Sequence, residues 1–266
     1  MKAYVSYLKS EIMAGIQYKA AALAGISTQF FWGVVLIMVY KAFYSYSSIS
    51  SINFRELICY VWLGQAFFSV IYININDSEI TSKILNGTVA YELCRPYNLF
   101  CWWFMKLLAK RYSAVILRFL PIIIVSLILP KPYNLTLPIT LLAFILFIIS
   151  MFLGSIIVSM LNVLIRLITF FTMQEKGLTS IVCRIGDLLA GMILPLPLLP
   201  AIFSTIGEYL PFRLVGDLPF RIYSGNIMTE YALKSIVLQI IWIILLTIIG
   251  NMLMKISLKK VCIQGG

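Results

Sequence analysis

The sequence contains no histidine and only ten acidic residues among its 266 positions. Histidine is the commonest proton shuttle near neutral pH and the commonest zinc ligand in proteins, so its absence removes the usual catalytic triad and the usual zinc centre. The sequence also lacks a GxSxG nucleophile elbow and a GxxxxGK[ST] phosphate-binding loop. We therefore expect no catalytic, metal or nucleotide site in this chain.

Charged residues of both signs are scarce, at 12% of the chain, while 61% of residues are hydrophobic and the mean hydropathy is +0.97. Soluble domains are typically about one quarter charged. This composition predicts an all-α membrane protein built as a single unit over residues 1–266. Lys2, Lys9 and Glu11 interrupt any apolar core near the start, so we expect no cleaved signal peptide.

The net charge is +11. On a soluble protein this excess would suggest nucleic acid as a partner. Here the cations mostly flank apolar runs, which is the pattern that orients a chain in a bilayer. We expect a lipid bilayer and no nucleic acid as a partner. The five cysteines form no CxxC pair, so we expect free thiols at Cys59, Cys94, Cys101, Cys183 and Cys262.

Apolar runs predict about six transmembrane helices, because about twenty residues cross the hydrocarbon core. An interfacial helix over residues 1–19 precedes them. A second interfacial helix over residues 99–112 is expected to hold Trp102, Arg111 and neighbouring lysines at headgroup level. The predicted spans cover approximately residues 20–40, 57–75, 113–129, 137–157, 178–194 and 232–254.

Polar residues inside these runs are candidates for a translocation path, namely Gln65, Asn74 and Asp187. Asp187 lies three residues after Arg184, so the two side chains can pair on one helical face, as a structural ion pair or within an ion pathway. Arg118 is expected either to extend toward the headgroups or to face a polar interior.

Residues 77–98, DSEITSKILNGTVAYELCRPYN, form the main polar stretch between two apolar runs. Ser78 is suited to cap a short amphipathic helix, and Lys83 lies near the helix end that favours positive charge. Gly87 is suited to the left-handed residue that follows such a helix, and Arg95-Pro96 opposes its continuation. We expect a short helix at the membrane surface that transmits force from a soluble partner.

Residues 195–226 are apolar but too rich in proline and too interrupted for a span. They predict an external re-entrant or surface-lying helical hairpin. The side with more lysine and arginine is expected to be cytoplasmic. It holds both termini and residues 77–98, while the other side holds Lys41, Arg55, Lys131, Arg213, Arg221 and Lys234.

Two motifs follow in a fixed order along the chain. The first is I-x-x-G-x-x-x-x-x-L-x-R-P, at Ile84, Gly87, Leu93, Arg95 and Pro96. The second combines L-P-F with P-x-x-x-x-x-G, at Leu210, Pro211, Phe212, Pro219 and Gly225. With six spans and an interfacial N-terminal helix, the whole chain resembles the ABC-2-type permeases, the membrane subunits of ATP-binding-cassette exporters.

The resemblance implies a permease that pairs with a second, identical or homologous permease above two copies of an ATPase subunit. ATP and Mg²⁺ would be bound by that ATPase. The complex would lie in a bacterial-type plasma membrane, export a drug, a peptide or a lipid-like cargo, and line its path with the first, second and fifth spans. The ATPase would contact a coupling helix with its flanking residues: Ser78, Glu79, Ile80, Lys83, Ile84, Gly87, Leu93, Arg95 and Pro96. The external hairpin would include Pro195, Pro200, Pro211, Phe212, Pro219 and Gly225.

Two other functions are compatible with the composition. A membrane scaffold that docks an enzyme would share the basic face without needing a path. A secondary carrier driven by an ion gradient would need buried acidic or histidine relays, and only Asp187 could serve as one.

Overall fold

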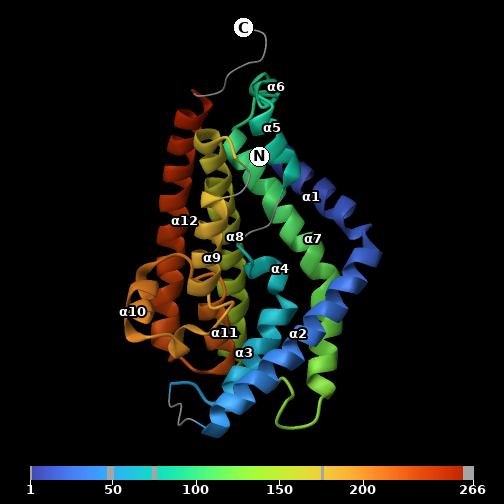
Figure 1. Cartoon of the computed structure of the whole chain (residues 1–266), viewed down its shortest axis with the longest axis vertical. Coiled ribbons are helices and arrows are strands. Elements are labelled where there is room, and N and C mark those ends of the chain that lie inside the picture. The colour runs from blue at the N-terminus through green and yellow to red at the C-terminus, as the bar shows by residue number, and fades with distance from the viewer. Residues whose placement is uncertain (1, 47–50, 74–76, 175–176, 260–266) are drawn as a thin grey trace.

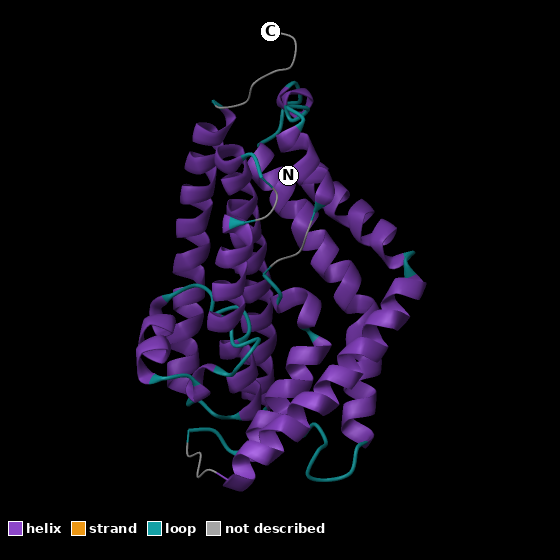
Figure 2. Cartoon of the chain, viewed as in Figure 1, coloured by secondary structure: helices purple, strands orange, loops and turns teal. Residues whose placement is uncertain are grey.

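The computed structural model describes residues 2–46, 51–73, 77–174 and 177–259. Every regular element in these residues is helical (Figure 2), which agrees with the predicted all-α class. Four helices are long and apolar enough to cross a membrane: α2 (Lys19–Tyr46), α7 (Leu99–Ile128), α8 (Leu141–Thr172) and α12 (Thr229–Leu258). Helix α12 packs along α8, which also contacts α7 and α11.

The six predicted spans are not all found as long helices. The second is divided at Phe67 into α3 (Phe54–Ala66) and α4 (Phe68–Ile71), and the fifth is reduced to α9 (Leu178–Leu189). Nine of the thirteen α3 residues are buried. A helix enclosed by protein can be short and interrupted, because neighbouring elements satisfy the backbone groups that lipid could not.

Helix α7 corrects a second expectation. The predicted interfacial helix 99–112 and the third span are one continuous helix, capped by Asn98, whose Oδ1 accepts a hydrogen bond from Cys101 N. Lys106 and Arg111 are buried rather than exposed at headgroup level. Helix α8 likewise continues fifteen residues beyond the predicted end at Ile157, because its polar residues face other helices and not lipid.

Helix α1 (Lys2–Ile16) has no buried residue and lies against α7. The Tyr7 and Trp102 rings stack with centroids 3.8 Å apart, and Tyr4 Oη accepts a hydrogen bond from Asn98 N over 2.8 Å. A side chain at Gly15 would meet the Ser113 hydroxyl, so the two helices are in close approach there.

Residues 195–226 contain a 3-10 turn η1 (Leu196–Leu198) and two short helices, α10 (Ala201–Tyr209) and α11 (Asp217–Ser224). Helix α11 packs on α3 and α8. Gly225 follows α11 with φ +78°, a left-handed conformation that glycine adopts without strain. The buried Asp217 carboxylate accepts hydrogen bonds from Leu196 N and Tyr60 Oη, which tie η1 and α3 to α11.

Some of the connecting segments lie at two opposite ends of the molecule (Figure 1). The short helices α5 (Ser78–Leu85) and α6 (Ala90–Leu93) share one end with the C-terminal end of α12, while the loop joining α7 to α8 lies at the opposite end. That loop contains Lys131, which was predicted on the side opposite residues 77–98. Which face is cytoplasmic stays a prediction.

Candidate functional site

Helix α5 begins one residue earlier than the sequence suggested. The N-cap is Asp77, whose Oδ1 accepts a hydrogen bond from Ile80 N over 3.0 Å, and Ser78 is the first helical residue. A carboxylate there satisfies a free backbone N–H and also interacts favourably with the helix dipole. Gly87 has φ +67°, as predicted for the residue that follows the helix.

Helices α5 and α6 are joined by one ion-pair cluster. Lys83 Nζ lies 2.6 Å from Glu79 Oε1 and 2.7 Å from Glu92 Oε1. Trp103 of α7 donates its indole N–H to Glu92 Oε2 over 2.8 Å. The cluster therefore holds the two short helices together and against α7.

Two α7 lysines fasten the start of α5. Lys110 Nζ lies 2.7 Å from Asp77 Oδ2, and Lys106 pairs with both Asp77 and Glu79. Burial acts to raise the pKa of Asp77, but the hydrogen bonds from Lys110 and Ile80 outweigh it and lower the pKa. Hydrogen bonds from Lys106 and Lys83 lower the pKa of Glu79. The Asp77 and Glu79 carboxyl groups are thus ionised at neutral pH.

The other predicted residues of this segment differ in their exposure to solvent. Ile80 and Ile84 are buried under α5, whereas Leu93, Arg95 and Pro96 are exposed. The neighbouring Tyr91 is also exposed, at 76%. The segment therefore presents α6 and the following turn at the end of the molecule, with an apolar surface that a partner could cover.

A second polar cluster holds the backbone where α4 ends. Arg111 of α7 is fully buried, and its guanidinium donates to the carbonyls of Val70 and Tyr72 over 3.0 and 2.6 Å. Asn162 of α8 donates to Ile73 O over 2.7 Å. Asp187 of α9 accepts from Ile73 N over 3.1 Å. Three helices thus fix one short stretch of chain, residues 69–73, which we call the α4 clamp.

Asp187 belongs to this clamp and does not line the cavity described next. Arg184 does approach it, at 3.8 Å, so the predicted ion pair is present but long. Asn74, another predicted path residue, lies outside the described residues. Arg111 was expected at the headgroups, and its role here could not be inferred from sequence because nothing local distinguishes it from a surface arginine.

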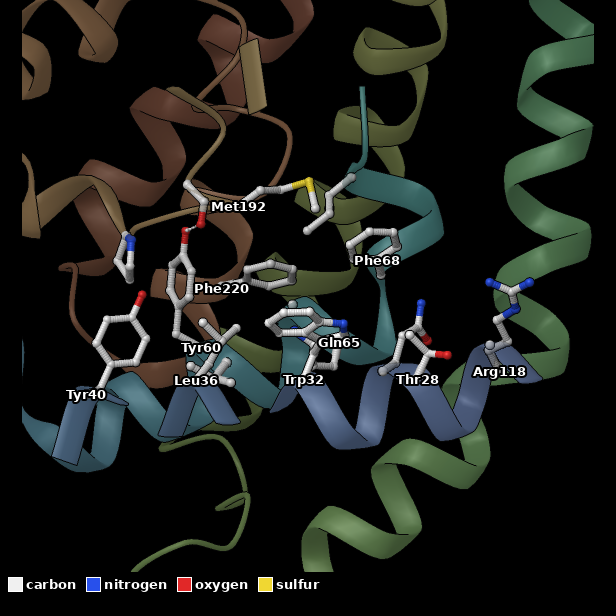
Figure 3. A pocket seen from close by; sticks show the side chains of 17 residues that line it. Thr28, Trp32, Leu36, Tyr40, Tyr60, Gln65, Phe68, Arg118, Met192 and Phe220 are labelled. Atoms are coloured by element: carbon white, nitrogen blue, oxygen red, sulfur yellow. Dashed lines mark hydrogen bonds between the residues drawn. The ribbon is translucent and has the colours of Figure 1, made fainter. Parts of the chain in front are cut away.

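A cavity of about 410 Å³ lies between α2, α3, α4, α7 and the segment after α9 (Figure 3). Gln65 and the half-buried Arg118 line it. Sequence reasoning missed Gln29, which also lines it. The signal was present, since Gln29 is an amide inside the first apolar run. The remaining side chains are mainly aromatic or apolar and include Trp32, Leu36, Tyr40, Tyr60, Phe68, Met192 and Phe220.

Comparison with protein families gives one decisive result. The model of the ABC-2 family transporter proteins matches residues 6–265. The chain belongs to this family. Comparison with curated proteins gave no match.

Membership in the ABC-2 family makes the chain a membrane component of a transport system, and such components generally partner with ATP-binding-cassette ATPases. The multi-pass arrangement of apolar helices agrees with that role. In the described residues, no group of three potential ligand side chains is placed to hold a metal ion. Cys59, Cys94, Cys101 and Cys183 are free thiols, and Cys262 lies outside the described residues.

Proposed function

We propose that this chain is the permease subunit of an ATP-binding-cassette exporter. Two permeases, identical or homologous, form the path, and two copies of a separate ATPase, which binds ATP and Mg²⁺, contact α5 and α6. Six segments cross the bilayer: α2, α3 with α4, α7, α8, α9 and α12. Both termini face the cytoplasm of a bacterial-type cell, and residues 195–226 form the external hairpin.

The observation that carries the proposal is the joint attachment of two elements to α7. Lys106 and Lys110 hold the start of α5, and Arg111 holds the end of α4. A displacement of α5 by a partner would therefore act on α7, a continuous helix of thirty residues. Since α4 and α7 both line the cavity, the same displacement would alter the cavity.

Copurification with a candidate ATP-binding-cassette ATPase tests the proposed contact. Leu93→Glu places a charge on the exposed apolar surface of α6, and we expect it to reduce copurification and ATPase stimulation at least tenfold. Met228→Glu is the matched control, because Met228 is also exposed and lies just before α12, whose far end is the one beside α6. Equal effects of the two variants would contradict the docking surface.

A labelling experiment tests on which side of the membrane residues 77–98 lie. Cys94 is exposed beside α6, so a membrane-impermeant maleimide should label it in opened cells and not in intact ones, with Cys94→Ser as the blank. Labelling in intact cells would place the segment on the outside and refute the proposal. A scaffold would instead bind the ATPase without changing its hydrolysis rate.

A further inference from the structure

The cavity beside α2 has a shape that suits an elongated ligand. Figure 3 shows its labelled side chains in a row, with Arg118 at one end and Tyr40 at the other. Thr28 and Tyr40 are twelve residues apart on α2, which corresponds to about 18 Å of helix. A compact ligand would fill only part of this length.

The middle of the cavity is apolar and aromatic. Trp32, Tyr60, Phe68 and Phe220 line it from four helices, α2, α3, α4 and α11. Tyr60 directs its hydroxyl away to Gly191 O and Asp217, at 3.0 and 3.2 Å, and so satisfies it within the protein. The rings therefore offer their apolar surfaces to a ligand body.

The charge of the cavity has one sign. Arg118 is the single charged residue among its lining side chains in the described part of the chain, and no carboxylate lines it. The guanidinium donates one long hydrogen bond, of 3.4 Å, to Ala21 O, and its buried Nε has no partner among the described residues. The half-buried guanidinium has no carboxylate beside it in this cavity, and a bound anion would supply a charge-assisted hydrogen-bond partner.

Gln29 gives a second, independent indication of a ligand. It is 6% exposed, and its Oε1 has no hydrogen-bond partner among the described residues. Buried polar atoms are normally paired. Gln29 follows Thr28, near the Arg118 end, so a hydroxyl or amide close to the ligand's charged group could donate to it.

We propose that this cavity takes an anionic amphiphile, with its phosphate, sulfate or carboxylate at Arg118 and its apolar chain along the rings toward Tyr40. This rests on the proposed transport function and names its substrate class. Aromatic rings alone would also attract organic cations. A cation here would meet Arg118 and no carboxylate, so the charge pattern favours the anion.

Binding to the purified full chain in nanodiscs tests the proposal without the ATPase. Three probes with the same brominated chain are compared by their quenching of tryptophan: 11-bromoundecyl phosphate, 11-bromoundecanol and 11-bromoundecyltrimethylammonium. We expect the phosphate to bind at least about tenfold more tightly than the other two, the value of a charge-assisted hydrogen bond. Equal or tighter binding of the ammonium probe would overturn the proposal.

Variants of single residues show which side chains recognise the phosphate probe. Arg118→Gln should abolish the phosphate preference and leave the alcohol unchanged, while Arg118→Lys should retain most of it. The control Arg55→Gln removes an exposed arginine outside the cavity and should change nothing. Trp32→Phe should reduce the quenching amplitude, because Trp32 lines the apolar part of the cavity.

Different results would refute the proposed transport function and the proposed anion site. Phosphate-selective binding that disappears in Arg118→Gln, without any effect of the probe on ATPase activity, would refute the transport function and leave the site standing. Probe-stimulated ATPase activity without anion selectivity, or selectivity that persists in Arg118→Gln, would refute the site alone.

Discussion

The two polar clusters on α7 differ in how much solvent reaches them. In the cluster around α5, the Glu79 side chain is 57% exposed and Lys83 is 28% exposed. In the α4 clamp, Arg111 is fully buried and bonds to backbone carbonyls. Exposed ion pairs contribute little and are screened by salt, whereas buried charges cannot lose a partner without a large cost. The Lys83–Glu79 part of the α5 attachment is therefore adjustable, whereas the buried Asp77–Lys106 pair and the α4 clamp are rigid.

This contrast suits a membrane protein that must respond to a soluble partner. The solvent-exposed ion pair between Lys83 and Glu79 can rearrange at small cost when a partner binds. The end of α4 lies among helices, where unsatisfied backbone groups cost several kcal/mol. It is held by arginine because one guanidinium can donate to several carbonyls at once.

Removal of Arg111 should have the largest effect. Arg111→Met leaves the carbonyls of Val70 and Tyr72 without this donor, and we expect a loss of about 3–5 kcal/mol in stability. Thermal unfolding of the purified chain measures it. Arg184→Met is the matched control, since that side chain is 69% exposed and its pair with Asp187 is long. It should cost less than about 1 kcal/mol. Similar losses in both variants would remove the distinction between the clusters.

Variants of Asp77 separate the stability contributed by the N-cap of α5 from that contributed by the ion pair with Lys110. Asp77→Ala removes the N-cap acceptor and the partner of Lys110, so we expect a loss of about 1–3 kcal/mol. Asp77→Asn keeps a capping oxygen and loses the ion pair, and it should recover roughly 1 kcal/mol. Thermal unfolding of both variants separates the contributions. An asparagine variant as unstable as the alanine variant would show that the cap is unimportant.

Gly87 tests the backbone between α5 and α6. Gly87→Ala forces a side chain onto a residue with φ +67°, which should cost about 1–2 kcal/mol. Gly64→Ala is a helical control with open space, where the nearest atom to an added Cβ is 4.0 Å away. It should be neutral or slightly stabilising. Hydrogen exchange of residues 77–93 should increase in the first variant and not in the second.

Glu79 should give the smallest effect, with a defined pH dependence. Its pKa is lowered from the ordinary 4.5 by hydrogen bonds from Lys106 and Lys83. A lowered carboxyl pKa contributes stability that is present above the ordinary value and is lost as pH falls through the lowered one. The advantage of wild type over Glu79→Gln, below about 1 kcal/mol, should be constant from pH 6 to 8, decrease below pH 4.5 and vanish only below the lowered pKa. An advantage that persisted in strong acid would contradict this.

Several features followed from local sequence alone. The apolar runs were long enough to require helices in lipid, and residues 20–40 and 232–254 became α2 and α12 with slightly extended ends. Gly87 and Gly225 took the left-handed conformation that a glycine after a helix usually adopts. These outcomes depend on residues within a few positions of one another, so the sequence contains the whole cause.

Other features depended on residues far apart in the chain. Arg111 was predicted at headgroup level, because hydropathy cannot show that four backbone carbonyls between residues 69 and 73 lie beside it. Residues 57–75 were predicted as one span, because no pattern in the nearby sequence shows that other helices enclose α3. Composition and short-range pattern thus determined that this chain is helical and suited to lipid. Tertiary structure decided which polar groups meet, since a buried charge is stable only where distant segments supply its partners.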